Sequence, residues 1–179
     1  MCNIKTLFSY EEMDSPMGPL TVIATQNGVC RIDFGSLEEN LPSLQSWMSK
    51  HYLKGELIHS PEKLKPVVDQ LASYFSGNLQ QFTIPLDLYG TPFQIKVWEE
   101  LKGIPYGATC SYKDIAQGIG APKAVRAVGS ANNKNPVPII IPCHRVVGSN
   151  GALVGYGGGL DKKELLLNIE LQNFIPKSS

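Results

Sequence analysis

Residues 111–136, SYKDIAQGIGAPKAVRAVGSANNKNP, decide the fold of the second half of the chain. Two helix-forming segments flank the breaker Gly-Ala-Pro at 120–122, and Ser111 suits the N-cap of the first. We expect the second helix over 123–131. Ala116 and Gly120 stand four residues apart, the small-residue spacing that lets two helices cross closely. The pattern predicts a helix-turn-helix, although many proteins that bind no DNA contain such corners.

The second of these helices has an unusually small outer surface. Its candidate outer positions are Ala124, Ala127 and Gly129, with Lys123 and Arg126 as the polar exceptions. Sequence reading in the major groove needs several Asn, Gln or Arg side chains that reach base edges. This surface favours close approach to a nucleic-acid backbone or a minor groove, and it does not suit a sequence-specific regulator.

Upstream, TPFQIKVWEELKGI at 91–104 reads as a helix with a defined start. Thr91 suits the N-cap, Pro92 the first helical position, and Gln94 the third residue of a capping box. Gly90 precedes this start. We therefore expect two domains, 1–90 and 91–179.

The first half reads as α/β. LTVIATQNGVCRIDF at 20–34 places two β-rich runs around Asn27-Gly28, the strongest short hairpin signal. The segments at 37–52 and 61–75 look helical, and QFTIPLDL at 81–88 looks like a strand. We expect a small sheet with helices, followed by a mostly α-helical second domain.

Composition excludes several classes of protein. The chain has 179 residues and an ordinary apolar fraction of 42%. No apolar run approaches the roughly 20 residues that span a bilayer. Acidic residues in MCNIKTLFSYEEMD stand where a signal peptide would be apolar. The four cysteines are scattered, which favours reduced thiols over a disulfide framework. We expect a cytoplasmic protein with no membrane segment.

Charge is unevenly distributed, although the formal net charge is zero. Residues 1–90 hold six Lys and Arg against ten Asp and Glu, whereas residues 91–179 hold ten against six. Any polyanionic partner therefore meets the second half of the chain.

A reactive pair follows the helix-turn-helix, in IIIPCHRVVG at 139–148. Cys143 is either a buried structural thiol beside a surface histidine or a nucleophile with His144 as its base. Neighbouring side chains of an extended strand point to opposite faces. Direct contact between the two therefore requires a turn, for which Pro142 is a candidate, or a bridging water.

A histidine base usually needs an orienting acid, and Glu164 in LDKKELLLNIEL at 160–171 is the candidate. A competing interpretation is that Asp161 and Glu164 form only a capping box at the start of the last helix. The chain has no C-x-x-C, its histidines lack metal-ligand spacing, and GYGGGLDKK at 155–163 is no phosphate-binding loop. We expect no cofactor.

Taken together, residues 91–131 and 135–167, which end in NPVPIIIPCHRVVGSNGALVGYGGGLDKKELLL, resemble the O6-alkylguanine-DNA alkyltransferases. The resemblance covers nearly all of the second half. The first half resembles the family loosely, through DSPMGPL at 14–20 and the hairpin after it. This family implies a ribonuclease-H-like first domain and a second domain with a helix-turn-helix.

The resemblance implies an alkyl acceptor at Cys143, activated by His144 through a water, with Glu164 orienting His144. Tyr112 would donate a proton toward the guanine leaving group, and Asn135 would act as a hinge between the recognition helix and the active-site strand. Arg126 would fill the space left by a flipped-out base. The flipped base would lie against Tyr112, Val146, Tyr156 and Gly157, and DNA contacts would come from Lys123, Ala124, Arg126, Ala127, Gly129 and Ser149.

The family implies the partner as well: double-stranded DNA carrying O6-alkylguanine, and O4-alkylthymine as a second lesion, bound by a monomer with little sequence preference. Some relatives bind zinc in the first domain. Cys30 falls near one such position, but Thr25 stands where a second ligand would be expected, so we predict no zinc site.

Three other functions remain open at this point. A lesion-recognition protein of the same fold would lack the acceptor cysteine, a transcription regulator would need a richer reading helix, and a cysteine hydrolase would turn over. The number of alkyl groups removed from DNA per protein chain distinguishes these functions. One indicates repair, none indicates recognition or regulation, and many indicate a hydrolase.

Overall fold

A four-stranded sheet forms the base of the computed structural model, which describes residues 6–174. Its strands lie in the order β3-β2-β1-β4, with bounds Thr6–Met13 (β1), Leu20–Thr25 (β2), Gly28–Phe34 (β3) and Gly55–His59 (β4). Neighbouring strands are antiparallel except β1 and β4, which are parallel. The predicted hairpin at Asn27-Gly28 is confirmed. Gly28 is required there because its φ is +154° and a Cβ would lie 2.5 Å from the Pro85 carbonyl oxygen.

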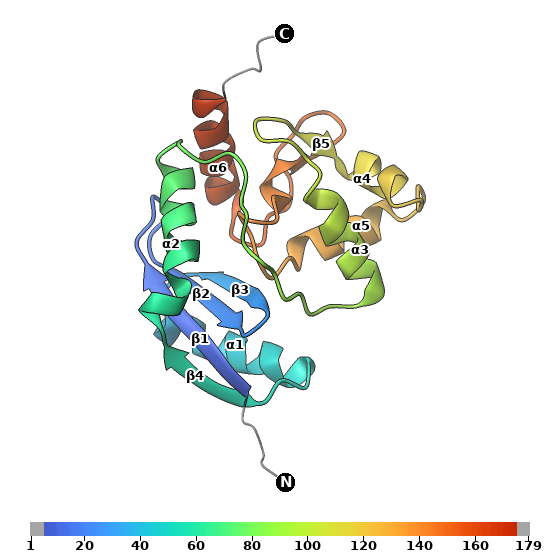
Figure 1. The fold of residues 1–179 in the computed structure, drawn as a ribbon. Coiled ribbons are helices and arrows are strands. Elements are labelled where there is room, and N and C mark those ends of the chain that lie inside the picture. Colours follow the sequence, from blue (N-terminus) through green and yellow to red (C-terminus); the bar gives the residue numbers. More distant parts are fainter. Residues whose placement is uncertain (1–5, 175–179) are drawn as a thin grey trace.

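Two helices cover the sheet, one on each face (Figure 1). Helix α1, Leu37–Lys50, packs Leu44 against a small cluster with Phe8 and Ile23. Helix α2, Pro61–Phe75, runs over 61–75 as the sequence predicts and buries its apolar stripe against the opposite face. That stripe consists of Leu64, Val67, Leu71 and Tyr74.

The predicted strand at 81–88 is wrong. This segment makes only an isolated bridge between Val29 and Leu86, with hydrogen bonds from Val29 N to Pro85 O and from Asp87 N to Val29 O. Pro85 has no N–H to extend a ladder, so the segment runs past β3 as a connection.

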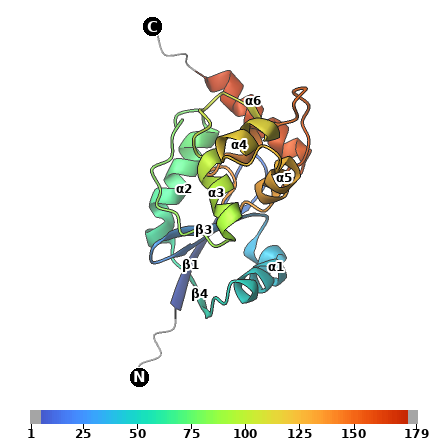
Figure 2. The same cartoon turned by 90° about the vertical axis from the view of Figure 1, so that its right-hand side faces the viewer.

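Helices dominate the second half, as expected (Figures 1 and 2). Their bounds are Pro92–Leu101 (α3), Tyr112–Gly118 (α4), Val125–Asn133 (α5) and Leu160–Asn173 (α6), with short strands at Cys110–Ser111 (β5) and Val146–Val147 (β6) and a 3₁₀ turn at Cys143–Arg145 (η1). The capping boxes of α3 (Thr91 with Gln94) and α4 (Ser111 with Asp114) are both present. None of the helices within residues 6–174 has the length and hydropathy of a membrane span.

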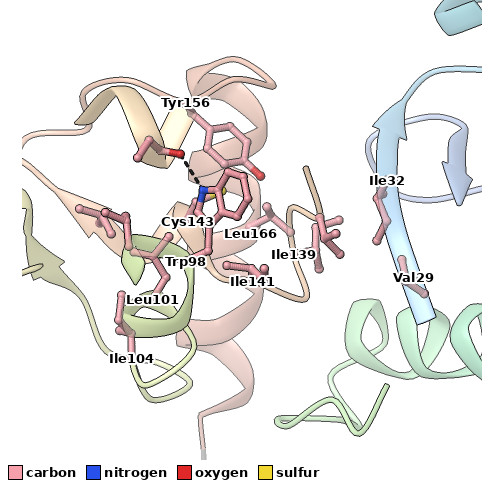
Figure 3. Close-up of a cluster of buried hydrophobic side chains, with 14 of the residues drawn as sticks. Val29, Ile32, Trp98, Leu101, Ile104, Ile139, Ile141, Cys143, Tyr156 and Leu166 are labelled. Atoms are coloured by element: carbon pink, nitrogen blue, oxygen red, sulfur yellow. Dashed lines mark hydrogen bonds between the residues drawn. The ribbon is translucent and has the colours of Figure 1, made fainter. Parts of the chain in front are cut away.

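One apolar core joins the two halves. It continues from Leu20 and Val22 on the sheet to Trp98 of α3 and Leu166 of α6. Trp98 donates its indole N–H to the Ala131 carbonyl at 2.8 Å and so fixes α5 on α3 (Figure 3). A backbone bond from Ile32 N to Pro136 O, at 2.9 Å, attaches β3 to the segment before Cys143. The sheet therefore supports the loop that carries the candidate nucleophile.

Candidate active site

Cys143 lies at the start of a 3₁₀ turn, not at the end of a strand. The expectation that the three isoleucines before Cys143 form an apolar strand is wrong: Ile139 has a φ of +75°, a conformation that strains a β-branched residue, and a tight turn runs through 137–141. Cys143 N donates to Ile141 O at 2.8 Å. The turn removes the difficulty that adjacent strand residues face opposite ways, and it buries Cys143 among apolar side chains (Figure 3).

Asn135 fixes this turn. Its amide nitrogen donates to Ile141 O at 2.9 Å, and its amide oxygen accepts from Val137 N at 2.9 Å. Asn135 therefore closes the loop that links α5 to Cys143, where the resemblance implies a hinge. It also lowers the pKa of the Cys143 thiol through a side-chain hydrogen bond.

The Cys143 thiol is protonated at neutral pH. Burial raises its pKa to about 11, and hydrogen bonds from Asn135 and the Tyr156 hydroxyl and the charge of Lys163 offset that rise only in part. The Tyr156 hydroxyl makes no hydrogen bond of good geometry among residues 6–174, and its effect on the pKa of Cys143 is the smallest of these. A thiol with this pKa needs a base to react.

His144 is fully buried, and Glu170 holds it. The His144 Nε2 and Glu170 Oε1 atoms are 2.6 Å apart. Burial lowers the pKa of His144, against the opposing effect of Glu170. Burial would raise the pKa of Glu170, but hydrogen bonds from His144 and Arg145 outweigh it and hold that pKa at about 2. The pair at neutral pH is thus a neutral imidazole on an ionised carboxylate.

The tautomer of His144 follows from this geometry. An ionised carboxylate only accepts hydrogen bonds, so Nε2 carries the proton and Nδ1 has the free lone pair. Nδ1 is buried and has no hydrogen-bond partner among residues 6–174. His144, the residue after Cys143, therefore has a basic nitrogen that is buried and free to accept a proton.

Glu164 is not the orienting acid, contrary to the prediction. Its side chain is exposed, in the first turns of α6. The competing capping-box interpretation also fails, because α6 begins at the N-cap Gly159, with a φ of +100° and no side-chain cap. Six residues correspond to about 600° around a helix, so Glu164 and Glu170 face different directions. Glu170 lies four residues after the buried Leu166, and this spacing is the signal that could have identified it.

Lys163 is a functional candidate that sequence reasoning missed. Its side chain is fully buried, and its ammonium donates to the carbonyls of Val146 (2.5 Å), Val154 (3.0 Å) and Gly155 (3.1 Å). Burial lowers the pKa of Lys163, and the nearby Cys143 opposes that effect. A buried lysine beside a buried cysteine favours the thiolate over the thiol.

Two of the expected base-binding residues contact this lysine, Val146 through its carbonyl and Tyr112 through its ring. The Tyr112 hydroxyl donates to the same carbonyls, at 2.7 Å from Val154 O and 3.2 Å from Gly155 O. Tyr156 is buried and meets the Phe34 ring edge-on. Gly157 is exposed, and a Cβ there would lie 3.0 Å from the Asn133 carbonyl oxygen. Val146 is buried, so only its backbone is available to contact a bound base.

The helix-turn-helix is present, with α4 and α5 as its helices. The second helix begins at Val125, two residues later than predicted, and Ala124 is its N-cap. Gly120 is not a helix-crossing contact: its φ is +73° and a Cβ at this position would have no atom within 4 Å, so its backbone conformation makes the turn. Of the expected DNA contacts, the exposed ones are Lys123, Arg126, Ala127 and Ser149, and the half-buried ones are Ala124 and Gly129.

The region around Thr25, where the sequence predicts no zinc site, holds a hydrogen-bonded network. The Thr25 hydroxyl donates to Asp87 at 2.5 Å and the Tyr89 hydroxyl to the same oxygen at 2.9 Å. Cys30 is buried, which raises its pKa to about 12. Within residues 6–174 no group of three His, Cys, Asp or Glu side chains is placed to hold a metal ion.

These elements define a class of protein: a helix-turn-helix beside a buried cysteine with a His-Glu pair, attached to a small α/β domain. Two family models match, the DNA-binding domain of 6-O-methylguanine DNA methyltransferase over residues 92–172 and its ribonuclease-like domain over 8–88. The chain belongs to this methyltransferase family, and the expected fold class is confirmed.

The match extends over more than nine-tenths of the length of each of the following relatives. The methylated-DNA–protein-cysteine methyltransferase of Mycobacterium tuberculosis is 46% identical over 165 residues, covering 92% of this chain and 93% of its own. The methylated-DNA–protein-cysteine methyltransferase of Methanosarcina barkeri is 43% identical over 164 residues, which cover 92% of this chain and 98% of its own. The crystal structure of M. tuberculosis OGT in complex with DNA matches with a TM-score of 0.77 at 41% identity, over 93% of this chain and 94% of that one.

Proposed function

We propose that this protein repairs DNA by transferring the alkyl group of O6-alkylguanine to its own Cys143. One observation carries the assignment: a buried thiol adjoins a neutral His144 that an ionised Glu170 holds, beside a helix-turn-helix. Membership of the methyltransferase family supports the same reaction.

The step balances without a cofactor. The Cys143 proton passes to His144 Nδ1, directly or through a water, and the ionised Glu170 stabilises the imidazolium that forms. The Cys143 sulfur forms a bond to the alkyl carbon as the bond between that carbon and guanine O6 breaks. Guanine takes up a proton from the Tyr112 hydroxyl and leaves as the normal base, and the proton held by His144 is lost to solvent as solvent restores the proton of Tyr112. A thioether is not hydrolysed under these conditions, so one turnover consumes the protein.

Four further side chains support this step. Lys163 stabilises the Cys143 thiolate, and Asn135 fixes the turn that leads to Cys143. Tyr112 is the donor to the departing guanine, for which its hydroxyl must leave the Val154 and Gly155 carbonyls. The flipped base lies between Tyr156 and the backbone at Val146 and Gly157.

DNA handling belongs to the second half of the chain. The surface that approaches the DNA backbone carries mostly small side chains. It consists of Lys123, Ala124, Ala127, Gly129 and Ser149. Arg126 is exposed on α5 and stands in for the flipped-out base. O4-alkylthymine is a second substrate. The protein acts as a monomer and without zinc. It acts in the cytoplasm, a reducing compartment that suits the unpaired thiols of Cys30, Cys110 and Cys143.

Stoichiometry tests this function. Protein incubated with excess duplex DNA carrying radiolabelled O6-methylguanine should retain one methyl group per chain, with the guanine restored in the DNA. Retention of none would indicate lesion recognition or regulation. Release of many methyl groups per chain would indicate a hydrolase.

A further inference from the structure

Tyr74 reaches the active site from the other half of the molecule. It lies near the end of α2, within the part that matches the ribonuclease-like domain. Its side chain is fully buried, and its hydroxyl donates to Glu170 Oε1 at 2.7 Å. The same hydroxyl oxygen is 3.4 Å from His144 Nε2. An element of the first domain thus contacts both members of the His-Glu pair.

Glu170 Oε1 is the shared acceptor of this network. Tyr74, His144 and Arg145 all donate to it, and Arg145 also donates to Oε2, which accepts from Gly107 N as well. The single proton of the Tyr74 hydroxyl goes to Glu170, so its oxygen faces the Nε2–H of His144 with a lone pair. Both contacts favour a proton on Nε2 and leave Nδ1 as the base.

The position of the Tyr74 hydroxyl is fixed by packing. Its ring meets Phe75, Phe82 and Tyr106, at centroid distances of 5.6, 5.4 and 6.1 Å. These contacts belong to the ring and do not depend on the hydroxyl. The hydroxyl can therefore be removed while the packing stays.

Several charged or titratable groups act on His144. Glu170 and Lys163 belong to α6, Arg145 to η1, and Tyr74 to α2. Arg145 stacks over Tyr106. A donor to the Glu170 carboxylate makes that carboxylate a weaker partner for an imidazolium, so the Tyr74 hydroxyl helps to keep His144 neutral.

We propose that Tyr74 is a positioning residue for the transfer reaction, with which the ribonuclease-like domain sets the tautomer and the protonation of His144 through Glu170. This inference rests on the proposed function, because it assigns His144 as the base for Cys143. It gives the first domain a direct part in the active site.

Tyr74→Phe tests the proposal. Loss of one hydrogen bond should slow single-turnover methyl transfer about three- to tenfold, more at pH 6 than at pH 8. ¹⁵N NMR of labelled histidine should show a higher pKa for His144 and an increased share of the Nδ1–H tautomer. A purely structural role would change neither NMR property in the folded protein.

Tyr106→Phe is the matched control. Tyr106 lies in the same aromatic cluster, and its buried hydroxyl has no hydrogen-bond partner among residues 6–174. This variant should keep the wild-type rate, tautomer and pKa. Equal changes in both variants would overturn the proposal, as would an unchanged rate, tautomer and pKa in Tyr74→Phe.

A second substitution covers the case in which Tyr74→Phe does not fold. 3,5-Difluorotyrosine at position 74 keeps the ring and the hydroxyl and makes the hydroxyl a stronger donor. It should lower the pKa of His144, the opposite direction to Tyr74→Phe, and an unchanged or raised pKa would contradict the proposal. Wild-type protein that transfers no methyl group would refute the proposed function instead, while the NMR comparison would still decide whether Tyr74 sets the state of His144.

Discussion

At the residue scale, Glu170 connects stability and chemistry in one carboxylate. It accepts hydrogen bonds from Tyr74, His144 and Arg145, and its burial makes each of them matter. Removal of one partner from a buried ionic pair leaves the other uncompensated, at a cost of about 3–5 kcal/mol. The buried ion pair between Arg145 and Glu170 is therefore a structural requirement, whereas the contact between the neutral His144 and Glu170 serves the chemistry.

Glu170→Gln should slow methyl transfer by about a hundredfold, because a neutral amide cannot stabilise the imidazolium of His144. Single-turnover kinetics on O6-methylguanine duplex measure this. Glu164→Gln, on the same helix but exposed, should react at the wild-type rate. A slow Glu164→Gln variant with a normal Glu170→Gln variant would make Glu164 the orienting acid after all.

The pKa of Glu170 predicts how stability depends on pH. A free glutamate has a pKa of 4.5, and this one has a pKa of about 2. The lowered pKa contributes about 3 kcal/mol to the free energy of unfolding above pH 4.5, which is lost as the pH falls from about 4.5 toward 2. Urea unfolding at several pH values should show the gap between wild type and Glu170→Gln narrowing over that range. A gap that stays constant would show that Glu170 keeps an ordinary pKa.

At the element scale, the helix-turn-helix separates DNA handling from the transfer step. Arg126 is exposed on α5, whereas Cys143 and His144 are buried in the turn after that helix. A change at Arg126 can therefore alter access to the base without a change in the chemistry.

Arg126→Ala should slow repair of duplex DNA by roughly tenfold or more, since base flipping costs a few kcal/mol. Reaction with free O6-benzylguanine should be unchanged if the pocket admits that group. Cys143→Ala is the converse control, which should bind lesion DNA and abolish both reactions. If Arg126→Ala slows both substrates equally, its role is structural.

Helices with clear caps are predictable from the sequence, and much of the rest is not. The capping box at Thr91 and Pro61 predict the starts of α3 and α2, whereas α3 ends at Leu101, before the end of the segment at 91–104 that reads as helical. Strand β1 has no clear sequence signal because Glu11 and Glu12 interrupt its pattern, although parallel pairing with β4 stabilises it. Three isoleucines with high β propensity predict a strand where the turn at 137–141 lies. The Asn135 side chain hydrogen-bonds the backbone of Val137 and Ile141 and closes that turn against the propensity.

The site follows the same division. Local motifs predict four residues of the candidate site, because each lies in or beside a recognisable segment: Cys143, His144, Asn135 and Tyr112. They do not predict Glu170 and Tyr74, because these two contact His144 from 26 and 70 positions away in the sequence. No short motif records such contacts, and the helical spacing from Leu166 indicates only that Glu170 lies on the buried face of α6, not which residue it contacts. The domain boundary near Gly90 stays a prediction, and the family matches at 8–88 and 92–172 lie on either side of it.

At the scale of the whole molecule, the two halves form one functional unit. A continuous apolar core joins the sheet to Cys143, and α2 supplies Tyr74 to the His-Glu pair. The acidic balance of the first half and the basic balance of the second orient the molecule toward DNA. Binding should weaken as salt rises and depend little on flanking sequence, because phosphate contacts carry affinity without sequence information. Fluorescence titrations of Cys143→Ala at several salt concentrations measure this, and a strong sequence preference would favour a regulator.

Alkyl transfer to Cys143 itself can be measured by intact mass spectrometry after incubation with O6-methylguanine duplex, followed by peptide mapping. We expect one added methyl group per chain, located on the peptide that contains Cys143. A methyl group on Cys2, Cys30 or Cys110, or an unchanged mass while the lesion persists in the DNA, would contradict it.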